Sequence, residues 1–107
     1  MLRVEPVSIG KHEAISIEVK LPKTTLLAVT TKIGYIMCGA LDVHLLNTRL
    51  ADRRIVAGRA LGVRTIEDLL QAPLESVTAE AESLGIAAGM TGREAVRIML
   101  EAEAQSK

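Results

Sequence analysis

The chain has almost no aromatic side chains: its 107 residues include no Phe, no Trp and one Tyr. Because 49% of the residues are nevertheless hydrophobic, the core must be built from Val, Ile, Leu, Met and Ala. A chain of this length forms one domain, residues 1–107, and buries only a limited share of its surface. We therefore expect part of the aliphatic surface to be covered in a homo-oligomer.

Cysteine is nearly absent as well. The single residue, Cys38, excludes an intrachain disulfide, and with only His12 and His44 beside it no zinc-ligand spacing exists, so we predict no metal site. A free thiol suits a reducing cytoplasm, and no basic start followed by an apolar signal segment is present. The longest uncharged apolar run, residues 33–41, is about half of a membrane span. We expect a cytoplasmic protein that does not enter the membrane.

Net charge is also lacking, because thirteen basic and thirteen acidic residues cancel. The balance is uneven along the chain, at net +3 over residues 1–57 and net −3 over residues 58–107. Residues 62–73 resemble the first helix of a helix-hairpin-helix element, which grips nucleic-acid phosphates. That region is acidic, however, and one tyrosine offers little for base stacking. Nucleic-acid binding is therefore the weakest of the functional hypotheses.

The N-terminal half carries strand patterns. Ile15, Ile17, Val19 and Leu21 alternate with polar neighbours, which predicts a half-buried strand that ends at Pro22. Residues 24–32 follow as a β-branched strand. A third strand over residues 32–41 has no polar alternation and is typical of a central strand covered on both faces. A fourth strand is predicted over residues 55–63.

Helix patterns dominate the rest of the chain. Asp42 is placed to cap a helix over residues 43–50, Thr65 one over residues 66–72, and Thr91 with Glu94 one over residues 92–104. A further helix is predicted over residues 74–84, stopped by Gly85. The last helix has an apolar stripe, formed by Ala95, Val96, Met99, Leu100 and Ala102. The fold class is α+β: a small mixed or antiparallel sheet packed with C-terminal helices.

Cys38 allows two interpretations. A free cysteine in a strand is usually a small buried hydrophobe. It also lies four residues before a predicted helix start, where a thiolate is favoured. His44 is then the candidate general base and Asp42 the group that orients it. Asp42, His44 and Asn47 offer too few ligands for a metal. Whether the protein is an enzyme is left open by these residues.

Two arginines at helix starts suggest an anion site. Arg93 lies in the first turn of its helix, where the macrodipole disfavours a cation. An anion bound at the amides of Gly92 and Arg93 would be stabilised by the dipole and the guanidinium together. Arg64, just before the Thr65 cap, repeats the arrangement. Pairing with acidic side chains or with another subunit is the more common explanation for such arginines.

Several motifs occur together in the order of a known family, including "KLPKTTLLAV", "GYIMCGALDV", "IVAGRALGVRTIEDLL" and "GMTGREA". Over residues 18–100 the chain resembles the YunC-like family of small bacterial and archaeal proteins, a domain of unknown function. The resemblance implies a compact α+β domain and an assembly of several copies, with a trimer as one candidate. It supplies no cofactor, substrate or accepted catalytic residue. The positions that match the family motifs are Gly34, Tyr35, Cys38, Gly39, Asp42, Asn47, Arg59, Arg64, Gly92 and Arg93.

The first functional hypothesis is a homo-oligomeric, non-catalytic binding or interaction protein with a small anionic ligand. Its ligand-binding candidates are Arg59, Arg64, Gly92, Arg93, Tyr35 and Asn47. The alternative is an enzyme that uses Cys38 as the nucleophile, with His44 and Asp42 in support. Cofactors are unknown on either hypothesis.

Overall fold

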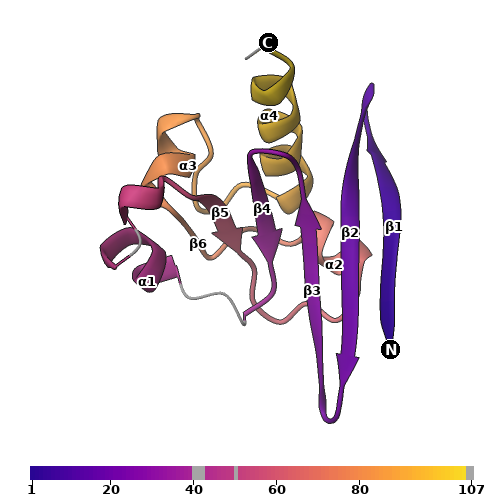
Figure 1. The fold of residues 1–107 in the computed structure, drawn as a ribbon. Helices are drawn as coiled ribbons and strands as arrows, with labels where there is room; N and C mark the ends of the chain where they lie inside the picture. Colours follow the sequence, from indigo (N-terminus) through magenta and orange to yellow (C-terminus); the bar gives the residue numbers. More distant parts are fainter. Residues whose placement is uncertain (40–42, 50, 106–107) are drawn as a thin grey trace.

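The computed structural model describes residues 1–39, 43–49 and 51–105, without the side chains of His44, Leu45 and Ala51. In this part of the chain six strands form one sheet whose spatial order equals the chain order (Figure 1). The elements, in order, are β1 (Leu2–Ile9), β2 (His12–Leu21), β3 (Thr24–Thr30), β4 (Gly34–Met37), α1 (Val43–Thr48), a 3₁₀ turn (Ala51–Arg53), β5 (Val56–Arg59), α2 (Ile66–Gln71), β6 (Ser76–Val77), α3 (Ala79–Ser83) and α4 (Gly92–Gln105).

The sheet is mixed, which confirms the predicted α+β class. Strands β1 to β4 form an antiparallel meander, β4 pairs in parallel with β5, and β5 pairs antiparallel with β6. The parallel pair is joined through α1, as such pairs need a crossover connection. The sheet thus extends into the second half of the chain, beyond the predicted N-terminal half.

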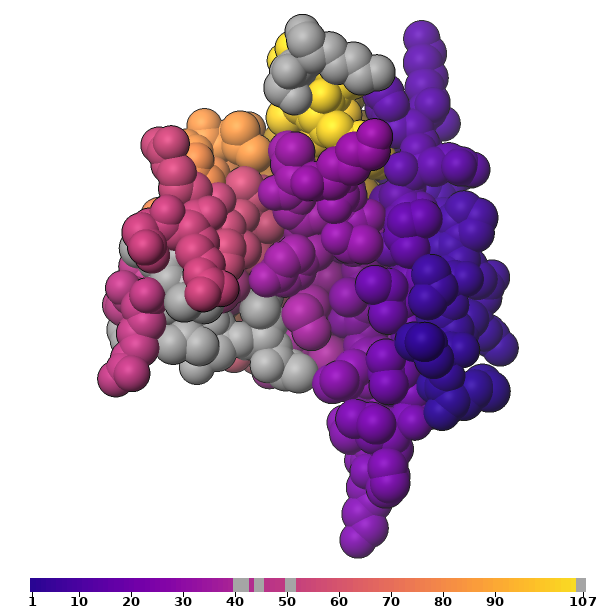
Figure 2. Space-filling view, in the orientation of Figure 1, coloured from indigo at the N-terminus to yellow at the C-terminus, as the bar shows by residue number. Residues whose placement is uncertain are grey.

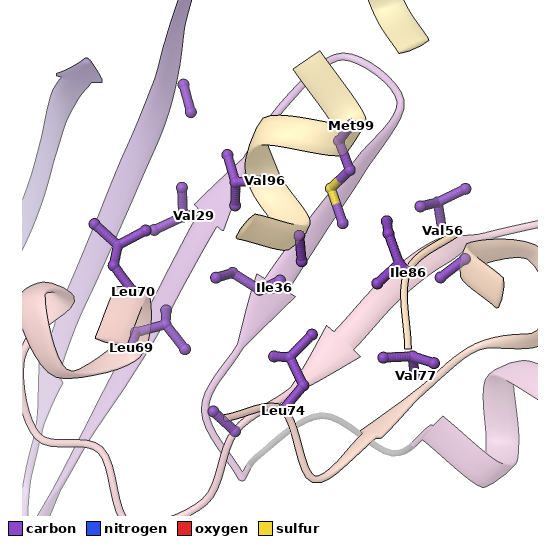
Figure 3. Packing of buried hydrophobic residues seen from close by; sticks show 14 of the residues in the cluster. Val29, Ile36, Val56, Leu69, Leu70, Leu74, Val77, Ile86, Val96 and Met99 are labelled. Carbon is purple, nitrogen blue, oxygen red and sulfur yellow. The ribbon is translucent and has the colours of Figure 1, made fainter. Parts of the chain in front are cut away.

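Three helices cover one face of the sheet. Helix α4 contacts β1, β2 and β4, α2 contacts β3 and α4, and α3 contacts β5. Figure 3 shows the core between them, where Ile36, Val96 and Met99 meet. The predicted α4 stripe is confirmed at its first four residues, which are buried, while Ala102 is only partly buried.

Helix α1 covers part of the opposite face. Val43 and Leu46 pack there with Ala57 of β5, and Tyr35 and Met37 of β4 lie against them. Because Ile36 belongs to the core on the helix α4 side, β4 is covered on both faces, as its uncharged sequence predicts. It is shorter than predicted, since it ends at Met37 rather than at residue 41.

Three assignments from the sequence need correction. Residues 2–9 form β1, where no element was predicted. The strand predicted over residues 55–63 covers only Val56–Arg59. The helix predicted over residues 74–84 is a short strand followed by α3, because Val77 pairs with β5 and Thr78 caps the helix. Gly85 follows the C-cap with φ +95°, as predicted.

Candidate functional site

Cys38 follows β4 and belongs to the core. Its side chain is 8% exposed and clusters with buried residues such as Ile36 and Val29. Its backbone N–H donates to the carbonyl of Leu27 at 3.1 Å. A nucleophile must be reached by its substrate, so this position favours the packing interpretation.

The proposed partners of Cys38 are only partly within the described residues. Asp42 lies outside them, both as a helix cap and as the group that orients a base. His44 is in α1 by its backbone, and its side chain lies outside the description. The Cys38–His44–Asp42 arrangement therefore stays a prediction. Among the described residues, no group of three or more His, Cys, Asp or Glu side chains is placed to hold a metal ion.

Asn47 has a structural contact. Its side-chain oxygen accepts from the N–H of Ala79 at 2.9 Å, which ties α1 to the start of α3.

Thr78 is the N-cap of α3 and is 1% exposed. Its hydroxyl accepts from Ala57 N–H at 3.1 Å and from Ala81 N–H at 3.2 Å. Thr78 was not predicted as a cap because it falls inside the helix predicted over residues 74–84. Its position before a short run of good helix formers is the signal of an N-cap.

Arg59 forms an ion pair within the sheet edge. Its Nε lies 3.0 Å from a carboxylate oxygen of Glu75, and its carbonyl accepts from the N–H of Glu75 at 2.7 Å. The hydroxyl of Ser76, followed by the Arg59 guanidinium, lowers the pKa of Glu75. This pair closes the β5–β6 edge, which is a structural role for Arg59.

The helix-start arginines are exposed, and the amides near them are partly occupied. The N–H of Arg64 donates to the carboxylate of Asp68 at 3.1 Å. The N–H of Gly92 donates to the carbonyl of Ala72 at 3.1 Å, so it is not free for an anion. A Cβ at Gly92 would collide with the carbonyl of Leu69, which explains the glycine by the close approach of α2 and α4.

The sheet carries an apolar surface that no helix of the described chain covers. Side chains alternate between the two faces of a strand, so the strand registers show which residues of β1 to β3 point away from α2 and α4. Figure 2 shows this side of the molecule, with β1 to β3 in indigo and purple on the right. We call it the bare face; Glu13 lies on it, and its apolar residues are Leu2, Val4, Pro6, Ile15, Ile17, Val19, Leu21 and Ala28.

Large exposed hydrophobic residues concentrate on the bare face. Leu2 is 65% exposed, Val4 56%, Leu21 45% and Ile15 40%. Away from this face and the chain start, only Leu61 and Leu84 are comparable among the described residues. Single exposed hydrophobic residues are ordinary, but a contiguous group of them marks an interaction surface.

The free edge of β1 is protected against pairing. Met1 and Lys20 exchange both of their backbone hydrogen bonds. Because hydrogen-bonded and non-hydrogen-bonded pairs alternate along antiparallel strands, the backbone of Pro6 points to the outer edge. Proline has no N–H, so it interrupts the row of donors that a further strand would need.

Known proteins resemble this chain over most of its length. The uncharacterized protein YunC of Bacillus subtilis (strain 168) is 57% identical over 101 residues, which cover 94% of this chain and 100% of the relative. The model of the family described as "Domain of unknown function (DUF1805)" matches residues 37–99. The chain belongs to the DUF1805 family.

A solved structure shares the fold of this DUF1805 protein. It is the crystal structure of a protein of unknown function, TA1206 from Thermoplasma acidophilum, with a TM-score of 0.81 and 28% identity over 91% of each chain. The stretch matched by the DUF1805 model begins in β4, so β1 to β3 and the bare face precede it. The similarity to YunC, in contrast, extends over nearly the whole chain. None of the helices in the described residues is long and apolar enough to cross a membrane.

Proposed function

We propose that this protein is a non-catalytic interaction domain that pairs with a second copy of itself through the bare face. It would do so in the reducing cytoplasm, to which its free thiol is suited. The observation that carries the proposal is the direction of the side chains on β1 and β2. The bare-face residues of these strands point away from the helices, whereas Val7, Ile9 and Ala14 point toward them and pack in or against the core.

Most charged residues of the same strands point the other way, with Glu13 as the exception. Arg3 lies 3.3 Å from Glu5 and 3.9 Å from Glu18, and all three are on the side of α2 and α4. Leu2 and Val4 are on the bare side. An antiparallel sheet with one solvated face normally keeps its apolar side chains on the packed face. The reversed pattern at this end supports the proposal that a partner covers the bare face.

A second copy is the partner that this surface fits. A twofold interface brings the same patch from both subunits together, so each patch must complement itself. An apolar sheet face meets that condition, since two such faces pack about 10 Å apart with interdigitating side chains. The formal net charge of zero removes long-range repulsion between copies. Pro6 disfavours the alternative of joining two sheets edge to edge.

The test is the mass in solution of Val4→Lys beside the unchanged protein, by sedimentation equilibrium. We expect the unchanged protein at micromolar concentration to have twice the mass of the 11.5 kDa chain. Val4→Lys places an ammonium group in an apolar interface, so its dissociation constant should rise at least about 100-fold.

Leu61→Lys is the matched control. Leu61 is 52% exposed, close to the value for Val4, and lies outside the bare face. It should leave the mass of the pair unchanged, with circular dichroism showing that both variants are folded. A monomeric unchanged protein would overturn self-association. A mass of three chains, or dissociation by Leu61→Lys but not by Val4→Lys, would overturn pairing through the bare face.

A further inference from the structure

The parallel pairing of β4 and β5 brings two basic segments together. Gly34 pairs with Val56, so the two strands begin at the same edge of the sheet. A Cβ at Gly34 would lie 2.5 Å from the carbonyl oxygen of Val56, which shows how closely the strands approach. Lys32 precedes β4, and the Arg53–Arg54 pair precedes β5. Residues 21 positions apart in the sequence thus meet at one site.

A pocket of about 280 Å³ lies between these segments. Three of its lining side chains are cationic, and none of the described lining residues carries a carboxylate. The chain's single tyrosine is also in the lining. This volume is near the lower end for ligand pockets, so it suits a small ligand. The lining residues are Thr31, Lys32, Ile33, Gly34, Tyr35, Arg53, Arg54, Ile55 and Val56.

Nearby carboxylates leave most of this charge uncompensated. Glu103 accepts from the backbone N–H of Lys32 at 2.8 Å. Glu80 lies 3.7 Å from Nε of Arg54, in a pair whose arginine side chain is largely exposed. Exposed pairs of this kind contribute little. Arg53 has no ion pair with another described residue, which leaves its guanidinium available for a ligand.

The backbone of Arg54 is strained at this site. Its φ is +53°, in the left-handed region that residues other than glycine rarely adopt. Such a conformation costs on the order of 1 kcal/mol and often occurs at residues that hold ligands. Here it turns the chain just before β5, so that consecutive arginines line the pocket.

We propose that this pocket binds the phosphate group of a small phosphorylated compound. Arg53 and Arg54 supply the planar donors that match phosphate oxygens, and Lys32 adds a point charge. Tyr35 is in the same lining and offers an apolar ring with a hydroxyl to the remainder of the ligand. The site goes beyond self-association and does not depend on it. It uses none of the helix-start residues Arg64, Gly92 and Arg93.

The fluorescence of Tyr35 gives a direct test, because the chain has no tryptophan and no second tyrosine. Inorganic phosphate is titrated at constant ionic strength, and glycerol 3-phosphate is titrated in parallel. We expect a saturable change for both. Tighter binding of the ester would show that the pocket contacts more than the phosphate, whereas equal binding would assign the site to free phosphate.

Two variants that each remove one positive charge distinguish binding in the pocket from a nonspecific effect of charge. Arg53→Gln should weaken binding at least about tenfold. Lys11→Gln removes one charge in the β1–β2 turn, outside the pocket, and should leave binding unchanged. A change that grows linearly without saturation to about 10 mM phosphate, or equal weakening by both variants, would overturn the proposal. Repeating the titration on Val4→Lys keeps the result independent of the oligomeric state.

Discussion

The two faces of the sheet differ in what covers them. One face lies under α2, α3 and α4 and is filled by fully buried aliphatic side chains. The opposite face has α1 over β4 and β5, and the bare-face residues Leu2, Val4, Ile15 and Leu21 are exposed on it. Similar residue types thus stabilise the monomer on one face and remain available to a partner on the other.

Two valines on neighbouring central strands test this difference most strongly. Val29 is fully buried under the helices, whereas Val19 lies on the bare face. Val29→Ala should lower the free energy of unfolding by about 2–3 kcal/mol, from lost burial and the cavity left behind. Val19→Ala should cost less than about 1 kcal/mol in dilute, monomeric protein. Urea denaturation measures both.

The Val29→Ala and Val19→Ala variants also test self-association when their stabilities are measured at high protein concentration. A partner that binds only the folded chain raises its apparent stability with concentration. Val19→Ala should therefore cost more at high protein concentration, while the cost of Val29→Ala stays constant. Equal costs for the two valines at low concentration would contradict the division between the faces.

A smaller effect than these stability changes is expected for the reactivity of the Cys38 thiol, which lies on the face covered by the helices. Iodoacetamide should alkylate the thiol at least about tenfold more slowly in the native protein than in urea, because the side chain is 8% exposed. Mass spectrometry over time gives both rates. Equal rates would show that Cys38 is accessible and would favour the hypothesis of a cysteine nucleophile.

The smallest expected effect is on the thermal stability, from an ion pair on the solvent-facing side of α4. A hydrogen bond from Arg97 lowers the pKa of Glu94 below its ordinary value of 4.5. A carboxylate with a lowered folded-state pKa stabilises the fold above its unfolded pKa and loses that contribution as the pH falls through the folded value.

Glu94→Gln should therefore lower the Tm slightly at neutral pH, and this effect should vanish as the pH falls through the lowered folded-state pKa. Thermal melts at several pH values measure this difference. Glu82→Gln, at an exposed position of α3 with no ion pair to another described residue, is the control. A cost for Glu94→Gln that grows as the pH falls would reverse the expected sign.

The strand pattern of β2 was predictable, but its orientation was not. Alternation of Ile15, Ile17 and Val19 predicts a strand with one apolar face. It does not indicate which face the helices will cover, and in the structure these residues face away from them. β1 was missed although Leu2, Arg3, Val4 and Glu5 alternate in the same way. Pro6 breaks this short pattern and counts against a strand, yet it is tolerated here because β1 is an edge strand.

The candidate sites were harder to predict. The caps at Thr65 and Thr91 depend on residues three positions apart, and both are confirmed by hydrogen bonds to the N–H of Asp68 and of Glu94. The basic pocket depends on the parallel register of β4 and β5, which no local pattern contains. Lys32 and Arg53 were therefore missed, although each segment is visibly basic in the sequence.

The sheet order has a consequence for how the chain folds. Because each strand pairs with its neighbour in the sequence, most of the sheet can close through short loops at low entropic cost. Helix α4 is different, since it packs against β1 at the opposite end of the chain. We therefore expect the meander to assemble while the chain is being synthesised. The hydrophobic core between the meander and the helices can be completed only after α4 has left the ribosome.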